Sequence, residues 1–200
     1  MYRPTAFAVD ERAALDAFVD AHPFALIASA AAAGEAPMLT HAPVLRHGDD
    51  TLVCHLARQN PHGDLLAAGA ATTVVFSGPH GYVSPRWYAA GRAVPTWNYT
   101  AVHCTVAGRE IEDADDLRAG MDAMVAQFES EPGIEQVVTP ATMEGMLRGI
   151  RGFRLHVRRR EGVFKLSQNR SDADRAGVLA GLAARGGADA RLADFMRSRS

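Results

Sequence analysis

The segment HLARQNPH, residues 55–62, combines residue types that suit the binding of a phosphate group. Asn60 is a favoured N-cap and Pro61 fits the first position of a helix, so a helix is expected to begin here. A helix N-terminus presents unpaired N–H groups and a partial positive charge, to which Arg58 and His62 would add. The alternative is an ordinary helix N-terminus beside a solvent-exposed arginine, and these residues alone favour that alternative.

A second candidate site is the segment YVSPRWYAAGRAVPTWNYTAVH, residues 82–103. It holds both tryptophans and three of the four tyrosines, although aromatic residues make up only 7% of the chain. One interpretation is that the rings cover one end of a barrel, as large amphipathic side chains often do. The other is a stacking surface for a flat ligand, with Asn98, Tyr99 and His103 supplying polar contacts near it.

A cluster of histidines raises the question of a metal site. Five lie within 63 residues: His41, His55, His62, His80 and His103. No pair has a zinc-site spacing such as CxxC, HExxH or HxxxH. In the adjacent pairs Cys54-His55 and His103-Cys104, neighbouring residues of a strand would point to opposite faces of the sheet. We therefore expect no metal site.

Composition and charge argue against several classes of protein. The 200 residues carry a net charge of −2, which provides no global basic field to attract nucleic acid. The arginine run 158–160 is the one candidate patch for nucleic acid, and its alternative is a solvated strand edge. Cys54 and Cys104 are far apart, which favours a reducing cytoplasm over a disulfide framework. The sequence shows no signal peptide and no apolar stretch long enough to span a bilayer.

Nucleotide and hydrolase motifs are also missing. The chain contains no G-x-S-x-G or P-loop pattern, and "GPHGY" (78–82) lacks the spacing of a Rossmann fingerprint. The missing motifs argue against a Rossmann NAD site. The sequence therefore identifies no catalytic residue.

Hydrophobic periodicity predicts an α+β fold built on antiparallel strands. The short connections between predicted strands 23–29, 37–45 and 51–57 require an antiparallel meander. Further strands are expected at 71–77, 80–84, 96–112 and 152–167. Helices are expected after Asp10, at 61–68, from Ser84 to Gly91, at 112–130, at 171–184 and after Gly187. Seven or so antiparallel strands with inserted helices suggest a closed or split β-barrel.

Several longer motifs resemble those of a known family. "MYRPTAF", "GPHGYVSPRWY", "VPTWNYTAVH", "GIRGFRLHV" and "KLSQNR" with a following aspartate occur in this order in PaiB-type proteins, which are described as FMN-binding negative transcriptional regulators. The motifs extend from residue 1 to about residue 182, so the resemblance covers nearly the whole chain. One departure is Gly81, which stands where the family motif has alanine; both residues are small.

The resemblance implies an antiparallel FMN-binding split β-barrel, as in pyridoxamine-phosphate oxidases, with inserted and C-terminal helices. We expect this domain over residues 1–184 and a peripheral helix or tail at 185–200. The resemblance also implies a homodimer with FMN between the subunits, the FMN phosphate at 55–62, and the motifs PTWNY and KLSQN near the flavin or the dimer seam. The residues expected to bind the cofactor are His55, Arg58, Asn60, Pro61, His62, His80, Trp97, Asn98, Tyr99, Lys165 and Ser167.

Three functions are consistent with these features. The first is an FMN-binding regulator or sensor of the PaiB type, with DNA as a candidate partner that neither charge nor motif supports. The second is a flavin-dependent oxidoreductase acting on a small molecule, in which His41, His80 or His103 would tune the flavin or move a proton. The third is a split-barrel module that binds haem or another small molecule. All three would be cytoplasmic proteins without a membrane segment.

Overall fold

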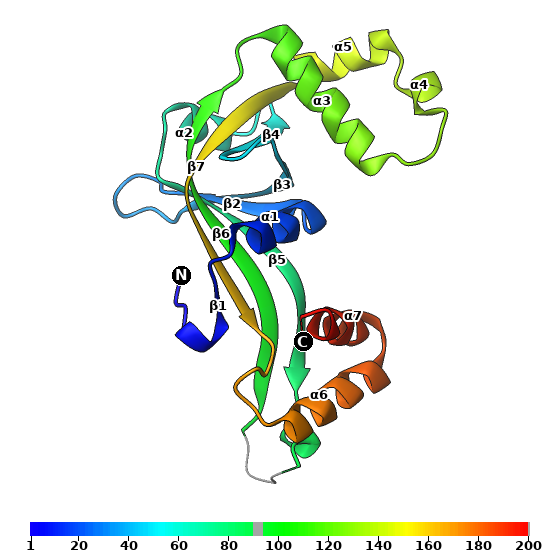
Figure 1. Ribbon diagram of the computed structural model, residues 1–200. Coiled ribbons are helices and arrows are strands. Elements are labelled where there is room, and N and C mark those ends of the chain that lie inside the picture. Colours follow the sequence, from blue (N-terminus) through cyan, green and yellow to red (C-terminus); the bar gives the residue numbers. More distant parts are fainter. Residues whose placement is uncertain (90–93, 200) are drawn as a thin grey trace. The chain divides into compact units, whose positions relative to one another are not determined.

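The structure is a computed structural model that describes residues 1–89 and 94–199 (Figure 1). This part of the chain contains an antiparallel sheet of seven strands in the order β1-β7-β4-β3-β2-β5-β6, with an additional pairing of β7 and β6. The strands are β1 (Ala8–Val9), β2 (Phe24–Ser29), β3 (Met38–Arg46), β4 (Thr51–Ala57), β5 (Thr72–Val83), β6 (Thr96–Glu110) and β7 (Ile150–Lys165). The predicted α+β class with an antiparallel sheet is confirmed.

The helices were predicted in part. They are η1 (Thr5–Phe7), α1 (Arg12–Ala21), α2 (His62–Ala67), η2 (Pro85–Trp87), α3 (Ala114–Phe128), α4 (Ile134–Val137), α5 (Pro140–Arg148), α6 (Asp172–Arg185) and α7 (Gly187–Arg197). Two helices, α4 and α5, follow α3 between β6 and β7 and were not predicted (Figure 1). The strands expected at 71–77 and 80–84 form the single strand β5. Gly91, expected to end the helix that begins near Ser84, lies outside the described residues.

The chain divides into two compact units that share several elements. Unit 1 consists of Met1–Phe18, Phe76–His103 and Glu161–Ser200, and unit 2 of Val19–Val75 and Cys104–Arg160. The elements α1, β5, β6 and β7 contribute residues to both units. No helix of the described residues is sufficiently long and apolar to cross a membrane.

Unit 2 contains the predicted meander. β2 pairs with β3 from Phe24 opposite Pro43 to Ser29 opposite Met38, and β3 pairs with β4 through Val44 and Cys54. β4 continues the sheet by pairing with β7. Apolar side chains of these strands alternate between buried and outward positions, as the period of a half-buried strand requires. The fully buried side chains include Ile27, Val44, Leu52, Leu66, Val74, Phe153 and Leu155.

Unit 1 packs α6 and α7 against the ends of its strands. The Ser171 hydroxyl accepts a hydrogen bond from the Asp174 N–H at 3.2 Å, which is the cap that the sequence predicts for α6. Gly181 lies against the Trp87 ring, where a Cβ would be only 2.2 Å from the nearest ring atom. The close approach of α6 therefore depends on the absence of a side chain at this position.

The C-terminal segment expected as a peripheral helix forms α7 and packs closely. Leu192, Ala193 and Met196 are fully buried. The Phe195 ring meets Phe164 edge-on, with 5.5 Å between ring centroids. Leu192, Ala193 and Met196 have the i, i+1, i+4 spacing of one helix face. Because this face is buried, α7 contributes to the core of unit 1.

Candidate functional site

The predicted cofactor-binding residues fall into two groups, one in each unit. Unit 2 contains His55, Arg58, Asn60, Pro61 and His62; unit 1 contains His80, Trp97, Asn98, Tyr99, Lys165 and Ser167. Each group includes side chains that face solvent and side chains that are buried, so the members have different opportunities to meet a ligand.

Arg58 is an exposed cation held in place by backbone carbonyls. It follows β4, and its main-chain N–H donates to the carbonyl of Gly149 at 2.8 Å. Its guanidinium donates through Nε to the Arg148 carbonyl and through Nη2 to the Ile150 carbonyl, both at 2.8 Å. Within residues 1–89 and 94–199 it forms no ion pair with a carboxylate. The Arg58 guanidinium is therefore held in a fixed orientation, its charge is not neutralised by a carboxylate of the described residues, and its Nη1 can still donate a hydrogen bond.

An open hollow lies beside Arg58. Its volume is about 890 Å³ when the space open to solvent is counted, and it is lined by Arg58, Glu110, Ile111, Glu112, Ala114, Leu117, Leu147, Arg148, Ile150 and Arg151. Arg151 and Glu110 form an ion pair at 2.6 Å. The remaining charged side chains are two arginines and Glu112, so the lining retains an excess of positive charge.

Asn60 caps α2 as predicted. Its Oδ1 accepts a hydrogen bond from the His62 N–H at 3.0 Å. The next two N–H groups are also satisfied within the chain, because Gly63 donates to the Asn60 carbonyl and Asp64 to the Pro61 carbonyl. These bonds give α2, a helix of six residues, an ordinary capped N-terminus. The exposed positive group of this segment is thus the Arg58 guanidinium rather than a row of N–H groups.

His62 is fully buried and hydrogen-bonded through both ring nitrogens. Nδ1 lies 2.8 Å from the Thr40 hydroxyl, and Nε2 lies 2.8 Å from the Ser29 hydroxyl. Burial lowers the pKa of this imidazole below its ordinary value of 6.5. The structure therefore places His62 in the interior of unit 2, beneath the segment in which it was expected to meet a ligand.

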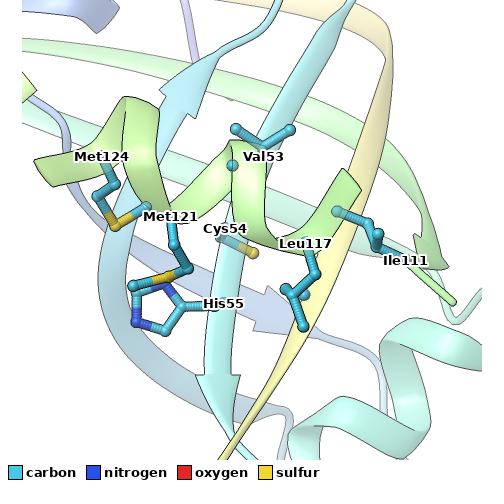
Figure 2. A pocket seen from close by; sticks show the side chains of 9 residues that line it. Val53, Cys54, His55, Ile111, Leu117, Met121 and Met124 are labelled. Atoms are coloured by element: carbon cyan, nitrogen blue, oxygen red, sulfur yellow. The ribbon is translucent and has the colours of Figure 1, made fainter. Parts of the chain in front are cut away.

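His55 lines a small apolar pocket that the sequence analysis missed (Figure 2). The pocket has a volume of about 250 Å³, counting open space, and lies between β4 and α3, with Met121 and Met124 reaching in from α3. The Nδ1 atom of His55 is buried and has no hydrogen-bond partner among the residues that the structure describes. Burial also lowers the pKa of this histidine. Met121 and Met124 lie three residues apart on one face of α3, a spacing that could have indicated the pocket.

The unit 1 group exposes large aromatic rings on β6. Trp97 is 55% exposed and Tyr99 is 37% exposed. The Trp97 ring lies 6.5 Å from the His80 ring and meets Tyr82 edge-on, with 6.1 Å between centroids. The exposed Trp97 ring offers a flat face of the kind on which an aromatic ligand stacks.

Asn98 and Ser167 face the interior of unit 1. Asn98 is fully buried, and its Nδ2 donates to the Ser167 hydroxyl at 2.9 Å. Ser167 adopts a left-handed backbone conformation with φ of 61° at the end of β7. Nearby, the half-buried Lys165 donates to the Thr96 hydroxyl, and burial lowers its pKa. Asn98 and Ser167 thus join β6 to the end of β7.

Residues 1–159 match the family described as "Putative FMN-binding domain". The "Protease synthase and sporulation protein PAI 2" of Bacillus subtilis (strain 168) is 32% identical over 185 residues, which cover 90% of this chain and 87% of that protein. The chain belongs to the PaiB-type FMN-binding family. Lys165 and Ser167 lie beyond the residues that the FMN-binding domain match covers.

Solved structures support the family's fold. The "FAD and Heme binding protein from Mycobacterium smegmatis" aligns with a TM-score of 0.64 at 22% identity, covering 84% of this chain and 78% of that one. The "Flavocytochrome Anf3 from Azotobacter vinelandii" also gives 0.64, at 16% identity, covering 79% and 69% of the two chains. The split-barrel architecture expected for a PaiB-type protein is therefore confirmed.

No metal site accompanies this fold in the part of the chain that the structure describes. There, no group of three or more histidine, cysteine, aspartate or glutamate side chains is arranged to hold an ion. Cys54 and Cys104 are both buried and form no disulfide, and burial raises the pKa of the Cys54 thiol to about 12.

Arg151, which lines the hollow beside Arg58, connects the strands of unit 2 to α2. Its guanidinium binds both carboxylate oxygens of Glu110, at 2.8 and 2.6 Å, and donates to Asp64 at 2.7 Å. The hydrogen bond from Arg151 lowers the pKa of Glu110 below its ordinary value of 4.5. The ion pair of Arg151 and Glu110 therefore stabilises the folded state above about pH 4.5. This contribution is lost as the pH falls through the lowered pKa of Glu110.

We predict that Glu110→Gln lowers the free energy of unfolding at pH 7 by about 1 kcal/mol, since solvent screens this partly exposed pair. The deficit should shrink as the pH falls through the lowered pKa of Glu110, because the wild-type carboxylate then becomes protonated. Urea unfolding between pH 7 and pH 3 measures this. Glu112→Gln, which removes an exposed carboxylate from the same hollow, is the control; a deficit independent of pH would contradict the assignment.

Proposed function

We propose that this protein binds FMN and that the Arg58 guanidinium contacts the FMN phosphate. Family membership supports the ligand class. The observation that carries the phosphate contact is that Arg58 is exposed, oriented by two carbonyls and not paired with a carboxylate among the described residues. A guanidinium with a free edge is suited to a phosphate, because its planar N–H groups match the phosphate oxygens.

We further propose that Trp97 and Tyr99 provide the aromatic contact in unit 1. Both rings point outward from β6, whereas Asn98 between them points inward. His80 lies next to Trp97 and is exposed, so it is placed to bring a titratable group to the same surface. The isoalloxazine ring supplies redox chemistry when bound, and these side chains would orient it.

A second copy of the chain is the proposed partner, as the family resemblance implies. The outward face of β2 and β3 in unit 2 carries Phe24, 66% exposed, and Leu39, 55% exposed. The Phe24 ring stacks on His41, with 6.0 Å between centroids and 20° between planes. Outward-facing Leu26 and Val75 sit opposite each other on β2 and β5 and extend this apolar face. Such a face is typical of a surface covered in an assembly.

We propose a cytoplasmic regulator or sensor that acts through its bound flavin. The net charge of −2 supports indirect action on transcription rather than direct DNA contact. Within the candidate basic patch, Arg160 is paired with Asp50, and nearby Arg154 with Asp116, which reduces its available positive charge. The buried, unbridged cysteines support a reducing compartment.

Arg58→Ala should weaken FMN binding by about tenfold to a hundredfold, because a hydrogen bond to a charged group contributes about 1.5–3 kcal/mol. Riboflavin lacks the phosphate, so its affinity should not change. Titration of both flavins, followed by quenching of their fluorescence, measures this. Arg158→Ala removes one exposed positive charge from β7 and is the matched control. Equal binding of FMN and riboflavin by the wild-type protein would show that the phosphate is not recognised.

Trp97→Ala should weaken FMN and riboflavin binding equally, by about tenfold, because ring stacking on an aromatic side chain contributes about 1–3 kcal/mol. The same fluorescence titrations test this. Tyr2→Ala removes another exposed aromatic ring from unit 1, Tyr2 being 87% exposed, and should leave both affinities unchanged. If Trp97→Ala binds both flavins as tightly as the wild-type protein does, the Trp97 ring covers the strand and does not contact the flavin.

Leu39→Lys should convert a wild-type dimer into a monomer, since a charge placed on the apolar face of β2 and β3 would be desolvated at the interface. Sedimentation velocity measures the mass of both proteins. Val137→Lys is the control, because Val137 is 71% exposed on α4 and belongs to a different surface of unit 2. A monomeric wild type, or a variant that stays dimeric, would refute this assignment of the interface.

A further inference from the structure

Buried and half-buried polar side chains around His62 form one continuous chain of hydrogen bonds in unit 2. Asn60 Nδ2 donates to the Thr40 hydroxyl at 3.4 Å, and that hydroxyl lies 2.8 Å from His62 Nδ1. On the other side of the ring, His62 Nε2 lies 2.8 Å from the Ser29 hydroxyl, which lies 2.7 Å from that of Thr72. The last hydroxyl donates to the Ala70 carbonyl at 2.8 Å.

The donor and acceptor of every hydrogen bond in this chain follow from the groups at its two ends, the Ala70 carbonyl and the Asn60 amide. A carbonyl accepts only, so Thr72 must donate its single proton to Ala70 and accept from Ser29. Ser29 has then used its own proton, so His62 Nε2 must donate to it. In a neutral imidazole the other nitrogen accepts, and the Thr40 hydroxyl therefore donates to Nδ1. The orientation of Asn60 is fixed independently, because its Oδ1 accepts from the His62 N–H.

We propose that His62 is a positioning residue: as the neutral Nε2–H tautomer, it orients Thr40 and thereby Asn60, and so fixes the turn that carries Arg58. The Asn60 N–H closes this turn on the Ala57 carbonyl at 2.8 Å. The side chain of Asn60 then connects the turn to β3 through Thr40. The proposal rests on the proposed contact of Arg58 with the FMN phosphate.

A direct contact of His62 with the ligand is not consistent with this geometry. The side chain is fully buried, and both nitrogens have partners within the chain. Protonation of Nδ1 would make Thr40 accept from two donors and lose its own bond, in an environment that already disfavours charge. The network therefore favours one tautomer and one orientation of the turn.

The tautomer can be measured directly. In ¹⁵N-labelled full-length protein at pH 7, the long-range ¹H–¹⁵N correlations of the His62 ring should show the neutral Nε2–H form, with and without FMN. His62→Asn, which lacks these ring correlations, assigns the signal. A neutral Nδ1–H ring, or an imidazolium at pH 7, would overturn the hydrogen-bond directions and with them the proposal.

The positioning role is tested by the preference for FMN over riboflavin. Thr40→Val removes the hydroxyl between His62 and Asn60, and should reduce this preference about tenfold while leaving riboflavin affinity within twofold. Thr73→Val, on β5 of the same unit, is the matched control. An unchanged preference in Thr40→Val, or an equal loss of both flavins, would overturn the positioning role.

The same measurements separate this proposal from the phosphate contact on which it rests. If Arg58→Ala loses the preference for FMN and Thr40→Val keeps it, the phosphate contact stands and the positioning role falls. If the wild-type protein has no preference, both fall, and the tautomer of His62 is still decided by the ring correlations.

Discussion

The guanidinium of Arg151 connects α2 to β6 and β7 in unit 2. It pairs with Glu110 on β6 and with Asp64 on α2, and its charged end lies 5.6 Å from the centre of the Phe153 ring on its own strand. The glycine at position 63 permits this approach, since a Cβ there would lie 2.9 Å from an Arg151 nitrogen. With α2 held against the strands, Leu66 becomes fully buried. Asn60 and His62 depend on this placement.

Arg58 and Arg151 lie close to the same hollow but have different electrostatic roles. Arg151 is saturated by two carboxylates, so it stabilises the fold and offers little to a ligand. Among the described residues, the Arg58 guanidinium binds carbonyl oxygens alone, which orient it without neutralising its charge. Preorganised charge of this kind gains more from an incoming phosphate than a flexible surface arginine does, because less side-chain entropy is lost on binding.

Local signals in the sequence predicted the elements but not the partners of the site residues. β4, residues 51–57, and the capped helix α6 were correctly placed because their periodicity and caps are local. α5 was missed although Met143, Met146 and Leu147 follow the i, i+3, i+4 spacing of a helix, because its nine residues are too few for the pattern to repeat. The capping role of Asn60 was readable from its neighbours, whereas His62 meets Ser29 and Thr40 through strand pairing that no local pattern encodes.

The family motifs combine two kinds of residue, which explains why they identify the family more readily than they identify ligand contacts. In PTWNY, the alternation of β6 turns Trp97 and Tyr99 outward and buries Asn98 against Ser167. In HLARQNPH, Arg58 faces solvent while His62 is enclosed by strand hydroxyls. The buried members form hydrogen bonds in the interior, and the loss of either partner would leave an unsatisfied polar group there. A long motif of this kind therefore combines an exposed surface with the polar interior beneath it.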